Sequence, residues 1–234
     1  MSRVDVDREL RRFGLGREDL GAWQQSGLPE EAFLDWVTDR VARRPAGARA
    51  QTVYGAENVH DFARRAILDA LDLQPGDCLL DVGCGGGLLL RDAMARGARA
   101  AGIDHSPDMV KLAQQRAPAA EVTLARAEKL PFADQTFTTI AMSIVFFFLA
   151  DPVGVLRECG RVLRAGGRIA VYTTGPELRG TPAAPEPLAS LGHFYEDAQL
   201  AALARGAELT NVSVENDRGG QLLVACKPAS SQRA

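Results

Sequence analysis

The stretch Leu79–Leu88 has the sequence LLDVGCGGGL and decides the fold class. A mostly apolar run leads into four glycines within five residues, and leucines follow directly. This pattern predicts a buried strand that enters a glycine-rich turn and opens a helix. Glycine lets the backbone approach a ligand closely, and the first N–H groups of the helix face polar or anionic groups. We therefore expect a site for a nucleotide-like cofactor, although a tight turn that needs glycine only for its geometry would have the same sequence.

Short apolar runs alternate with helical patterns from Cys78 onward. This alternation is typical of a parallel α/β sheet. Strands are expected at Cys78–Val82, Ala98–Ile103, Glu121–Ala125, Thr138–Ser143 and Arg168–Thr173, and helices at Leu88–Arg96, Pro107–Arg116 and Pro152–Leu163. After a further helix at Asp197–Arg205, the runs Leu209–Glu215 and Gln221–Cys226 predict a hairpin that closes the sheet with an antiparallel edge.

The N-terminal part has a different pattern, with helices separated by glycine and proline. One helix is expected to follow Pro29 and to end near Arg44, with an apolar face that includes Trp36 and Val41. We expect residues 1–50 to form a helical lid over the site, although they could also pack on the sheet as an extra layer. Residues 51–227 are then the cofactor-binding domain, and 228–234 a flexible tail.

Composition and charge narrow the class of protein. An apolar share of 46% and a charged share of 24% are ordinary for a globular domain. The net charge of −3 provides no basic field for nucleic acid. The apolar run Ile140–Ala150 is much shorter than the ~20 residues of a membrane span, and the N-terminus shows no export signal. The four cysteines lack metal-ligand spacing. We expect a cytoplasmic monomer or homodimer with reduced thiols, no metal and no membrane contact.

Asp81 indicates which cofactor the glycine turn accepts. It lies two residues before the first glycine, where a carboxylate would repel a pyrophosphate but would suit a cation. Dinucleotide folds usually have a third small residue where this chain has Leu88. S-adenosylmethionine has a sulfonium and an ammonium group and no phosphate, so it fits Asp81 better than NAD does. A nicotinamide-dependent oxidoreductase is kept as a less favoured alternative.

The glycine stretch resembles motif I of the S-adenosylmethionine-dependent methyltransferases of the seven-stranded, Rossmann-like class. The similarity continues in order through Gly102–Ser106, Ala127–Phe132, Phe137–Asp151 and Leu156–Arg168. It covers roughly Tyr54 to Lys227 and is strongest to the small-molecule group that includes the ubiquinone and menaquinone biosynthesis enzymes. The resemblance implies a three-layer α/β sandwich with strand order 3-2-1-4-5-7-6 and an antiparallel seventh strand. It also implies transfer of a methyl group to a small molecule.

The resemblance implies a set of cofactor-binding residues as well. Asp104 ends the second strand about twenty residues after the glycine turn, where a carboxylate accepts hydrogen bonds from a ribose. The residues after the third strand lie along the adenine. The full set is Asp81, Gly83, Cys84, Gly85, Gly87, Asp104, His105, Ala127, Glu128 and Ser143.

Two positions depart from the family pattern. The family often has an aspartate before the Ala-Glu pair, to accept the adenine amino proton, but this chain has Arg126, which cannot accept a hydrogen bond. Relatives also commonly have histidines at the end of strand four, where this chain has the apolar run Val145–Leu149. These departures keep open a second hypothesis, a protein that holds the cofactor without transferring methyl.

The catalytic group is not determined by the sequence. Tyr54, His60 and His193 are the candidates, although each histidine is equally compatible with a surface or helix-capping role. Alternation along a strand predicts that Phe146 and Phe148 share a face, and we expect both to line the pocket of an apolar or aromatic acceptor. Methyl transfer from a sulfonium is an in-line displacement that depends mainly on positioning, and a general base is needed only when the acceptor arrives protonated.

Overall fold

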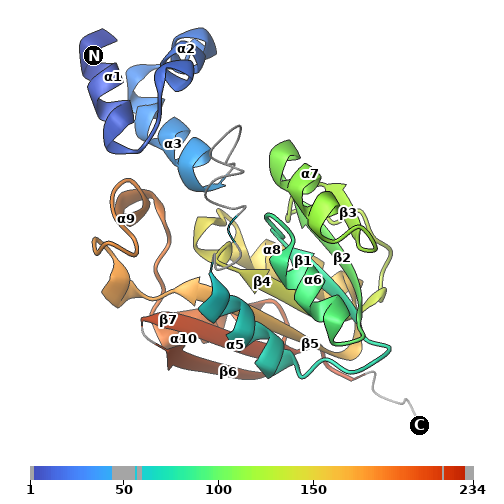
Figure 1. Cartoon of the computed structure of the whole chain (residues 1–234). Coiled ribbons are helices and arrows are strands. Elements are labelled where there is room, and N and C mark those ends of the chain that lie inside the picture. Colours follow the sequence, from blue (N-terminus) through green and yellow to red (C-terminus); the bar gives the residue numbers. More distant parts are fainter. Residues whose placement is uncertain (1–2, 44–55, 57–59, 218, 230–234) are drawn as a thin grey trace.

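A computed structural model describes residues 3–43, 56, 60–217 and 219–229. Within these residues the chain forms one seven-stranded sheet with the order β3-β2-β1-β4-β5-β7-β6 (Figure 1). β7 runs antiparallel to both of its neighbours, β5 and β6, whereas the pairs from β3 to β5 are parallel. The predicted fold class and strand order are confirmed. The strands are β1 Cys78–Val82, β2 Arg99–Asp104, β3 Glu121–Leu124, β4 Phe137–Ser143, β5 Leu163–Thr174, β6 Thr210–Asp217 and β7 Gly220–Cys226.

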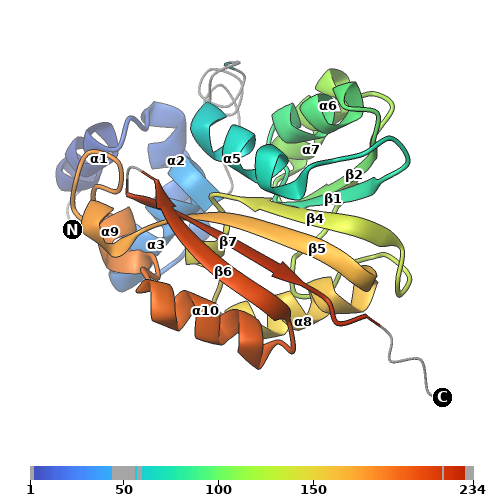
Figure 2. The same ribbon diagram turned by 90° about the horizontal axis from the view of Figure 1, so that it is seen from below.

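Helices cover both faces of the sheet (Figure 2). The adjacent residues Leu79 and Leu80 of β1 show why the strands are apolar throughout. Both are fully buried, but Leu79 packs in the cluster under α5, whereas Leu80 packs in the cluster under α8 and α10. One face carries α5 Asp61–Leu71, α6 Leu88–Ala95 and α7 Pro107–Arg116, and the other carries α8 Pro152–Val162 and α10 Asp197–Gly206.

Two helices begin where proline and a capping side chain predict a helix start. The Ser106 hydroxyl accepts a hydrogen bond from the N–H of Met109, and Pro107 is the first residue of α7. At the start of α8, the Asp151 carboxylate accepts from the N–H of Gly154 at 2.9 Å. α7 starts just after the carboxyl end of β2, whereas the 3-10 turn Phe146–Phe148 lies between the end of β4 and α8.

Strand β5 is longer than predicted. The sequence suggested Arg168 as its first residue, but the strand begins at Leu163, directly after α8. The partner of β4 shifts from Leu163 to Arg168 between adjacent ladder positions, so the residues between them bulge out of the pairing. Gly166 has φ 75° in this bulge. A pattern based on apolar alternation does not detect a bulge, which explains the difference.

The N-terminal helices form a separate cluster above the carboxyl ends of the strands (Figure 1). They are α1 Arg3–Arg12, α2 Arg17–Ser26, the 3-10 turn Glu30–Ala32, α3 Phe33–Thr38 and the π-helical turn Asp39–Arg43. The helix expected after Pro29 is thus three short pieces of different pitch. Their apolar side chains pack mainly on one another, in a core of Val6, Leu10, Leu15, Leu20, Phe33, Val37 and Val41. They do not form an extra layer on either face of the sheet.

Candidate functional site

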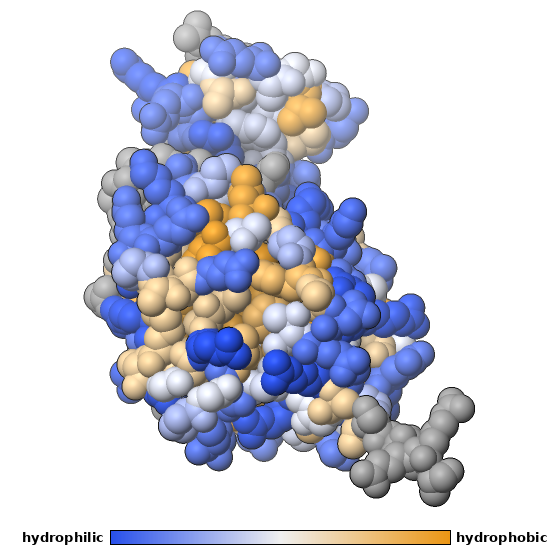
Figure 3. Space-filling model, turned by 90° about the vertical axis from the view of Figure 1, so that its right-hand side faces the viewer, coloured by the Kyte–Doolittle hydropathy of each residue, from blue (hydrophilic) through white to orange (hydrophobic). Residues whose placement is uncertain are grey.

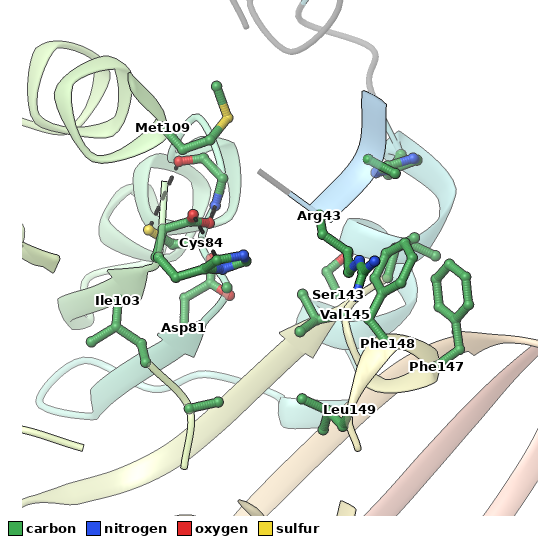
Figure 4. A pocket seen from close by; sticks show the side chains of 18 of the residues that line it. Arg43, Asp81, Cys84, Ile103, Met109, Ser143, Val145, Phe147, Phe148 and Leu149 are labelled. Atoms are coloured by element: carbon green, nitrogen blue, oxygen red, sulfur yellow. Dashed lines mark hydrogen bonds and ion pairs between the residues drawn. The ribbon is translucent and has the colours of Figure 1, made fainter. Parts of the chain in front are cut away.

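A cavity of about 470 Å³ lies at the carboxyl ends of β1, β2 and β4, and residues of the N-terminal helices also line it. Open α/β sheets bind their ligands at this position, where neighbouring connections leave the sheet in opposite directions. Figure 3 shows hydrophobic surface gathered directly below the N-terminal helices on the side that carries α7. In Figure 4, Asp81, Cys84 and Met109 line one side of the cavity, and Val145 and Phe148 line the other.

Two glycines of the turn are required by close contacts. Gly83 has φ 76°, and a Cβ there would lie 2.4 Å from Cγ2 of Val145. Gly87 has φ 80°, and a Cβ there would lie 2.9 Å from Cα of Ala113 in α7. Gly83 lines the cavity, whereas Gly87 does not. Gly87 lies at the contact between α6 and α7, and its expected contact with the cofactor stays a prediction.

The other expected cofactor residues all line the cavity. Asp81 and Asp104 are its most buried carboxylates, with 2% and 7% of their surfaces exposed. The carboxylate of Asp104 accepts hydrogen bonds from the N–H groups of Gly85 at 2.9 Å and Ser106 at 2.8 Å. His105 is placed beside it, with Nδ1 4.0 Å from the carboxylate. These contacts fix the Asp104 carboxylate beside the glycine turn.

Asp81 lacks the partners that Asp104 has. Its Oδ1 atom is buried and accepts no hydrogen bond within the described structure. Burial first, and the negative charge of Asp104 second, raise the pKa of Asp81 to about 8. A buried carboxylate oxygen without a donor is unfavourable unless a ligand supplies one. An ammonium group would supply both the donors and the opposite charge, so these residues fit the amino acid end of S-adenosylmethionine.

The segment after β3 forms the far wall of the cofactor side. Ala127 and Glu128 line the cavity, as expected. The Arg126 side chain is 72% exposed and forms an ion pair with Glu128 at 3.1 Å. It provides no hydrogen-bond acceptor for adenine, so backbone groups of this segment must take that role if adenine lies here.

The acceptor side differs from the prediction. β4 ends at Ser143, which lines the cavity, and residues Phe146–Phe148 form a 3-10 turn instead of a strand. Phe146 is fully buried in the sheet core and does not line the cavity, so its expected pocket role is wrong. Phe147 and Phe148 line the cavity instead, with ring centroids 4.0 Å apart. A turn of about three residues per repeat does not follow the alternation of a strand, and adjacent rings can therefore share a side.

The two described catalytic candidates, His60 and His193, lie in different places. His60 lines the cavity, and its backbone has the left-handed φ of 49° at the start of α5. Burial lowers the pKa of His60, so the imidazole is neutral at pH 7. His193 is not part of the cavity lining. Its N–H donates to the carbonyl of Phe147 at 2.7 Å, and its ring stacks on Tyr195. Tyr54 lies outside the described residues.

The sequence reasoning missed a charged stripe on the N-terminal helices. Asp35, Asp39 and Arg43 line the cavity from above, on α3 and the π-helical turn. Arg43 donates to the carbonyl of Asp35 at 3.0 Å, and its Nε lies 3.0 Å from Oδ1 of Asp39. The three residues recur every four positions, as do the apolar Phe33 and Val37 that pack inside the N-terminal core. The four-residue spacing of Asp35, Asp39 and Arg43, on the face opposite Phe33 and Val37, is the signal in the sequence that could have identified the stripe.

Two further observations concern the described residues alone. No group of three or more His, Cys, Asp and Glu side chains among them is arranged to hold a metal ion. In the same part of the chain, no helix has the length and apolar character that crossing a bilayer requires.

Comparisons with known proteins agree with this geometry. Residues 80–171 match the family described as "Methyltransferase domain". The chain is 34% identical over 144 residues to a demethylmenaquinone methyltransferase of Beutenbergia cavernae, covering 61% of this chain and 57% of the relative. It is 35% identical over 160 residues to a ubiquinone biosynthesis O-methyltransferase of Xanthomonas oryzae pv. oryzae, covering 59% and 64%. The chain thus spans less than two thirds of the length of either relative.

Solved structures share the fold. An S-adenosylmethionine-dependent methyltransferase from Aquifex aeolicus superimposes with a TM-score of 0.63 at 21% identity, covering 77% of this chain and 97% of that one. The [4+2]-cyclase SpnF superimposes with a TM-score of 0.60 at 20% identity, covering 80% and 87%. Residues 80–171 are thus similar to the methyltransferase domain family, and the Aquifex aeolicus protein that shares the fold is described as dependent on S-adenosylmethionine.

Proposed function

We propose that this protein transfers the methyl group of S-adenosylmethionine to a small acceptor with an apolar or aromatic body. The observation that carries the proposal is the buried, unpartnered oxygen of Asp81 in a cavity whose opposite wall is apolar. The cationic amino acid end of the cofactor would lie at Asp81, its ribose at Asp104, and its adenine along Ala127 and Glu128. The acceptor would occupy the space beside Phe147 and Phe148.

The cofactor supplies an activated methyl on a sulfonium, and the contribution of the protein is mainly positional. Holding two reactants in line can lower a barrier by about 7–11 kcal/mol in favourable cases. Ser143, the last residue of β4, and Val145 lie beside Phe148 on the side of the cavity that faces Asp81 (Figure 4). The phenylalanine pair and the N-terminal helices exclude water from the acceptor. His60 is the described candidate that can remove a proton from it, because it lines the cavity in its neutral form.

Purified protein incubated with methyl-labelled S-adenosylmethionine and a panel of phenols, quinols and amines tests the proposal. We expect label in at least one product, together with S-adenosylhomocysteine. We also expect calorimetric binding of S-adenosylhomocysteine and none of NADH. Binding of NADH and not of S-adenosylhomocysteine would favour the alternative function, a nicotinamide-dependent oxidoreductase.

A second candidate is a protein of this fold that holds the cofactor without methyl transfer. Two observations favour it: Arg126 occupies the position of the usual aspartate, and no histidine stands in the run Val145–Leu149. The likeness to SpnF shows the same fold in a protein described as a cyclase. Tight binding of S-adenosylhomocysteine with no labelled product from any acceptor would support this candidate over the first.

The expected substrate class, cellular location and oligomeric state stay predictions. A small-molecule acceptor agrees with the apolar cavity wall and with the net charge of −3. The cytoplasmic location and the monomeric or homodimeric state are proposed on the sequence alone.

Replacement of His60 tests the general base. With a protonated acceptor found in the panel, His60→Asn is expected to lower kcat by about 10²–10⁴-fold while binding S-adenosylhomocysteine normally. The pKa of His60 is lowered from its ordinary value of 6.5, so the neutral, basic form of the imidazole persists below pH 6.5. The wild-type rate should therefore fall only under more acidic conditions. His193→Asn is the matched control, because His193 lies outside the cavity lining. Equal rates in both variants would remove His60 from the mechanism.

The lid proposal is tested at its charged stripe. Arg43→Gln is expected to raise the KM of the acceptor by about ten-fold and to leave cofactor affinity unchanged, since Arg43 faces the acceptor side (Figure 4). Arg40→Gln is the control, because Arg40 pairs with Asp19 inside the N-terminal cluster and is not a cavity residue. Steady-state kinetics measure both. If the acceptor KM of the two variants is the same, the stripe has no part in acceptor binding.

A further inference from the structure

The residue Arg161 has a contact pattern that the proposed reaction does not use. It lies in the last turn of α8, away from the cavity, and its guanidinium donates five hydrogen bonds to protein groups. An arginine has five N–H donors, so every one of them is used. Two bonds go to the carbonyls of Leu130 at 3.1 Å and Phe132 at 2.9 Å, and one goes to the Asp134 carboxylate at 2.7 Å. All three partners belong to the segment that follows β3.

Glu158 completes the arrangement from the same helix. Its two carboxylate oxygens accept from Nε and Nη2 of Arg161 at 2.9 and 2.7 Å, which is the bidentate geometry of a strong ion pair. One of these oxygens also accepts from the N–H of Leu130 at 2.9 Å. The N–H of Gln135 donates to the backbone carbonyl of Arg161 at 3.0 Å. Both ends of residues 130–135 are therefore bound to α8.

The segment held in this way continues directly into the cofactor wall. Residues 125–128 line the cavity and follow β3 directly. At their start, the N–H of Ala125 bonds to the carbonyl of Asp104 at 3.0 Å. On the other side only a turn at Lys129 separates them from the buried Leu130. β3 is a short strand at the edge of the sheet, so the attachment at Leu130 is a second point at which this wall is held.

We infer that Glu158 and Arg161 are positioning residues for the cofactor, acting through residues 125–130. The pair holds the wall at a fixed distance from Asp104, so that the backbone is ordered before the adenosine arrives. Pre-ordering of a binding segment raises affinity because less conformational entropy is lost on binding. With Arg126 unable to accept from adenine, backbone groups carry the recognition, and their placement matters more. This inference rests on the placement of adenine beside residues 125–128 proposed above.

The variant Arg161→Lys tests the inference. Lysine keeps the charge but has no planar fork and too few donors for the five bonds. We expect S-adenosylhomocysteine to bind about ten-fold more weakly by calorimetry. Amide hydrogen exchange of the unliganded protein should become faster in residues 125–135 and stay unchanged in the glycine turn 83–87. The control is Arg157→Lys on the same helix, whose guanidinium bonds to the carbonyl of Gly206 in α10, and it should change neither quantity.

Three outcomes would overturn the inference. The first is unchanged affinity and exchange in folded Arg161→Lys protein. The second is exchange that rises equally in the glycine turn, which indicates a general loss of stability. The third is an equal loss of affinity in Arg157→Lys. If Arg161→Lys does not fold, Glu158→Gln replaces it, since glutamine keeps an acceptor for Leu130 and loses the ion pair; unchanged exchange and affinity there would be equally decisive.

The exchange comparison separates this inference from the proposed function. The comparison is made without ligand. Faster exchange limited to residues 125–135 therefore supports the positioning role of Glu158 and Arg161, even if wild-type protein failed to bind S-adenosylhomocysteine. Failure of wild-type binding would instead count against the cofactor assignment. Methyl transfer is not measured in either test.

Discussion

Asp81→Asn is expected to weaken binding of S-adenosylmethionine by at least about thirty-fold, which corresponds to roughly 2 kcal/mol or more. The variant keeps the shape of the side chain and removes the charge that would face the ammonium group. The matched control is Asp77→Asn, because Asp77 precedes the same strand at its opposite end and bonds there to the Thr138 hydroxyl. Isothermal calorimetry measures both variants, and equal affinity of wild type and Asp81→Asn would contradict the site.

The same substitution should stabilise the protein without ligand. The folded-state pKa of Asp81 is about 8, above its ordinary value of 3.8, so the folded protein loses stability relative to the unfolded chain as pH rises from about 4 to 8. Asparagine removes this loss, and urea unfolding at pH 7.5 should show a higher free energy of unfolding. Asp77→Asn should act in the opposite direction. Although burial acts to raise its pKa, hydrogen bonds from Gln74 and Thr138 and the charge of Arg168 lower it overall.

Cofactor affinity should also depend on pH. A cation binds to the ionised form of Asp81, so below pH 8 binding must release about one proton. The affinity should rise by up to about ten-fold per pH unit between pH 6 and 8 and level off above that range. Calorimetry in buffers of different ionisation enthalpy detects the released proton. A flat profile in wild-type protein would show that Asp81 is already ionised before the cofactor binds.

Gly87→Ala is expected to destabilise the fold by about 2–5 kcal/mol, because two costs add. A left-handed alanine costs roughly 1–2 kcal/mol. The new Cβ would also lie 2.9 Å from the backbone of Ala113, which cannot move without shifting α7. Gly85→Ala is the matched control in the same turn. Gly85 also has a positive φ, of 49°, but a Cβ there meets no atom within 4 Å, so only the first cost applies.

The variant that loses more stability, Gly87→Ala, should lose less affinity for the cofactor than Gly85→Ala does. Gly85 lines the cavity and Gly87 does not, so Gly85→Ala should reduce the affinity for S-adenosylhomocysteine more than folded Gly87→Ala does. Urea unfolding gives the stabilities, and calorimetry gives the affinities. A larger loss of affinity in Gly87→Ala than in Gly85→Ala would support the predicted contact of Gly87 with the cofactor.

The glycine turn, the strand order and most of the cofactor side of the cavity could be predicted from the sequence. Asp81 and Asp104 lie at the ends of adjacent parallel strands, which must meet at one edge of the sheet. The acceptor side was less predictable, because the run Val145–Leu149 is apolar in any conformation. Phe146 and Phe147 exchanged their expected places when the chain turned after Ser143, and no local pattern marks that turn.

The fold class and the acidic residues of the cofactor side were therefore predictable from local patterns in the sequence, which involve residues that are neighbours in the chain. The order of the strands was predictable from the family resemblance. Three features became apparent only from the packed structure: Gly87 contacts α7, the residues Asp35, Asp39 and Arg43 line the cavity, and Arg161 bonds to the segment after β3. Each of these depends on contacts between residues distant in sequence, such as Gly87 with Ala113, and the distance between such residues is decided only when the helices pack on the sheet.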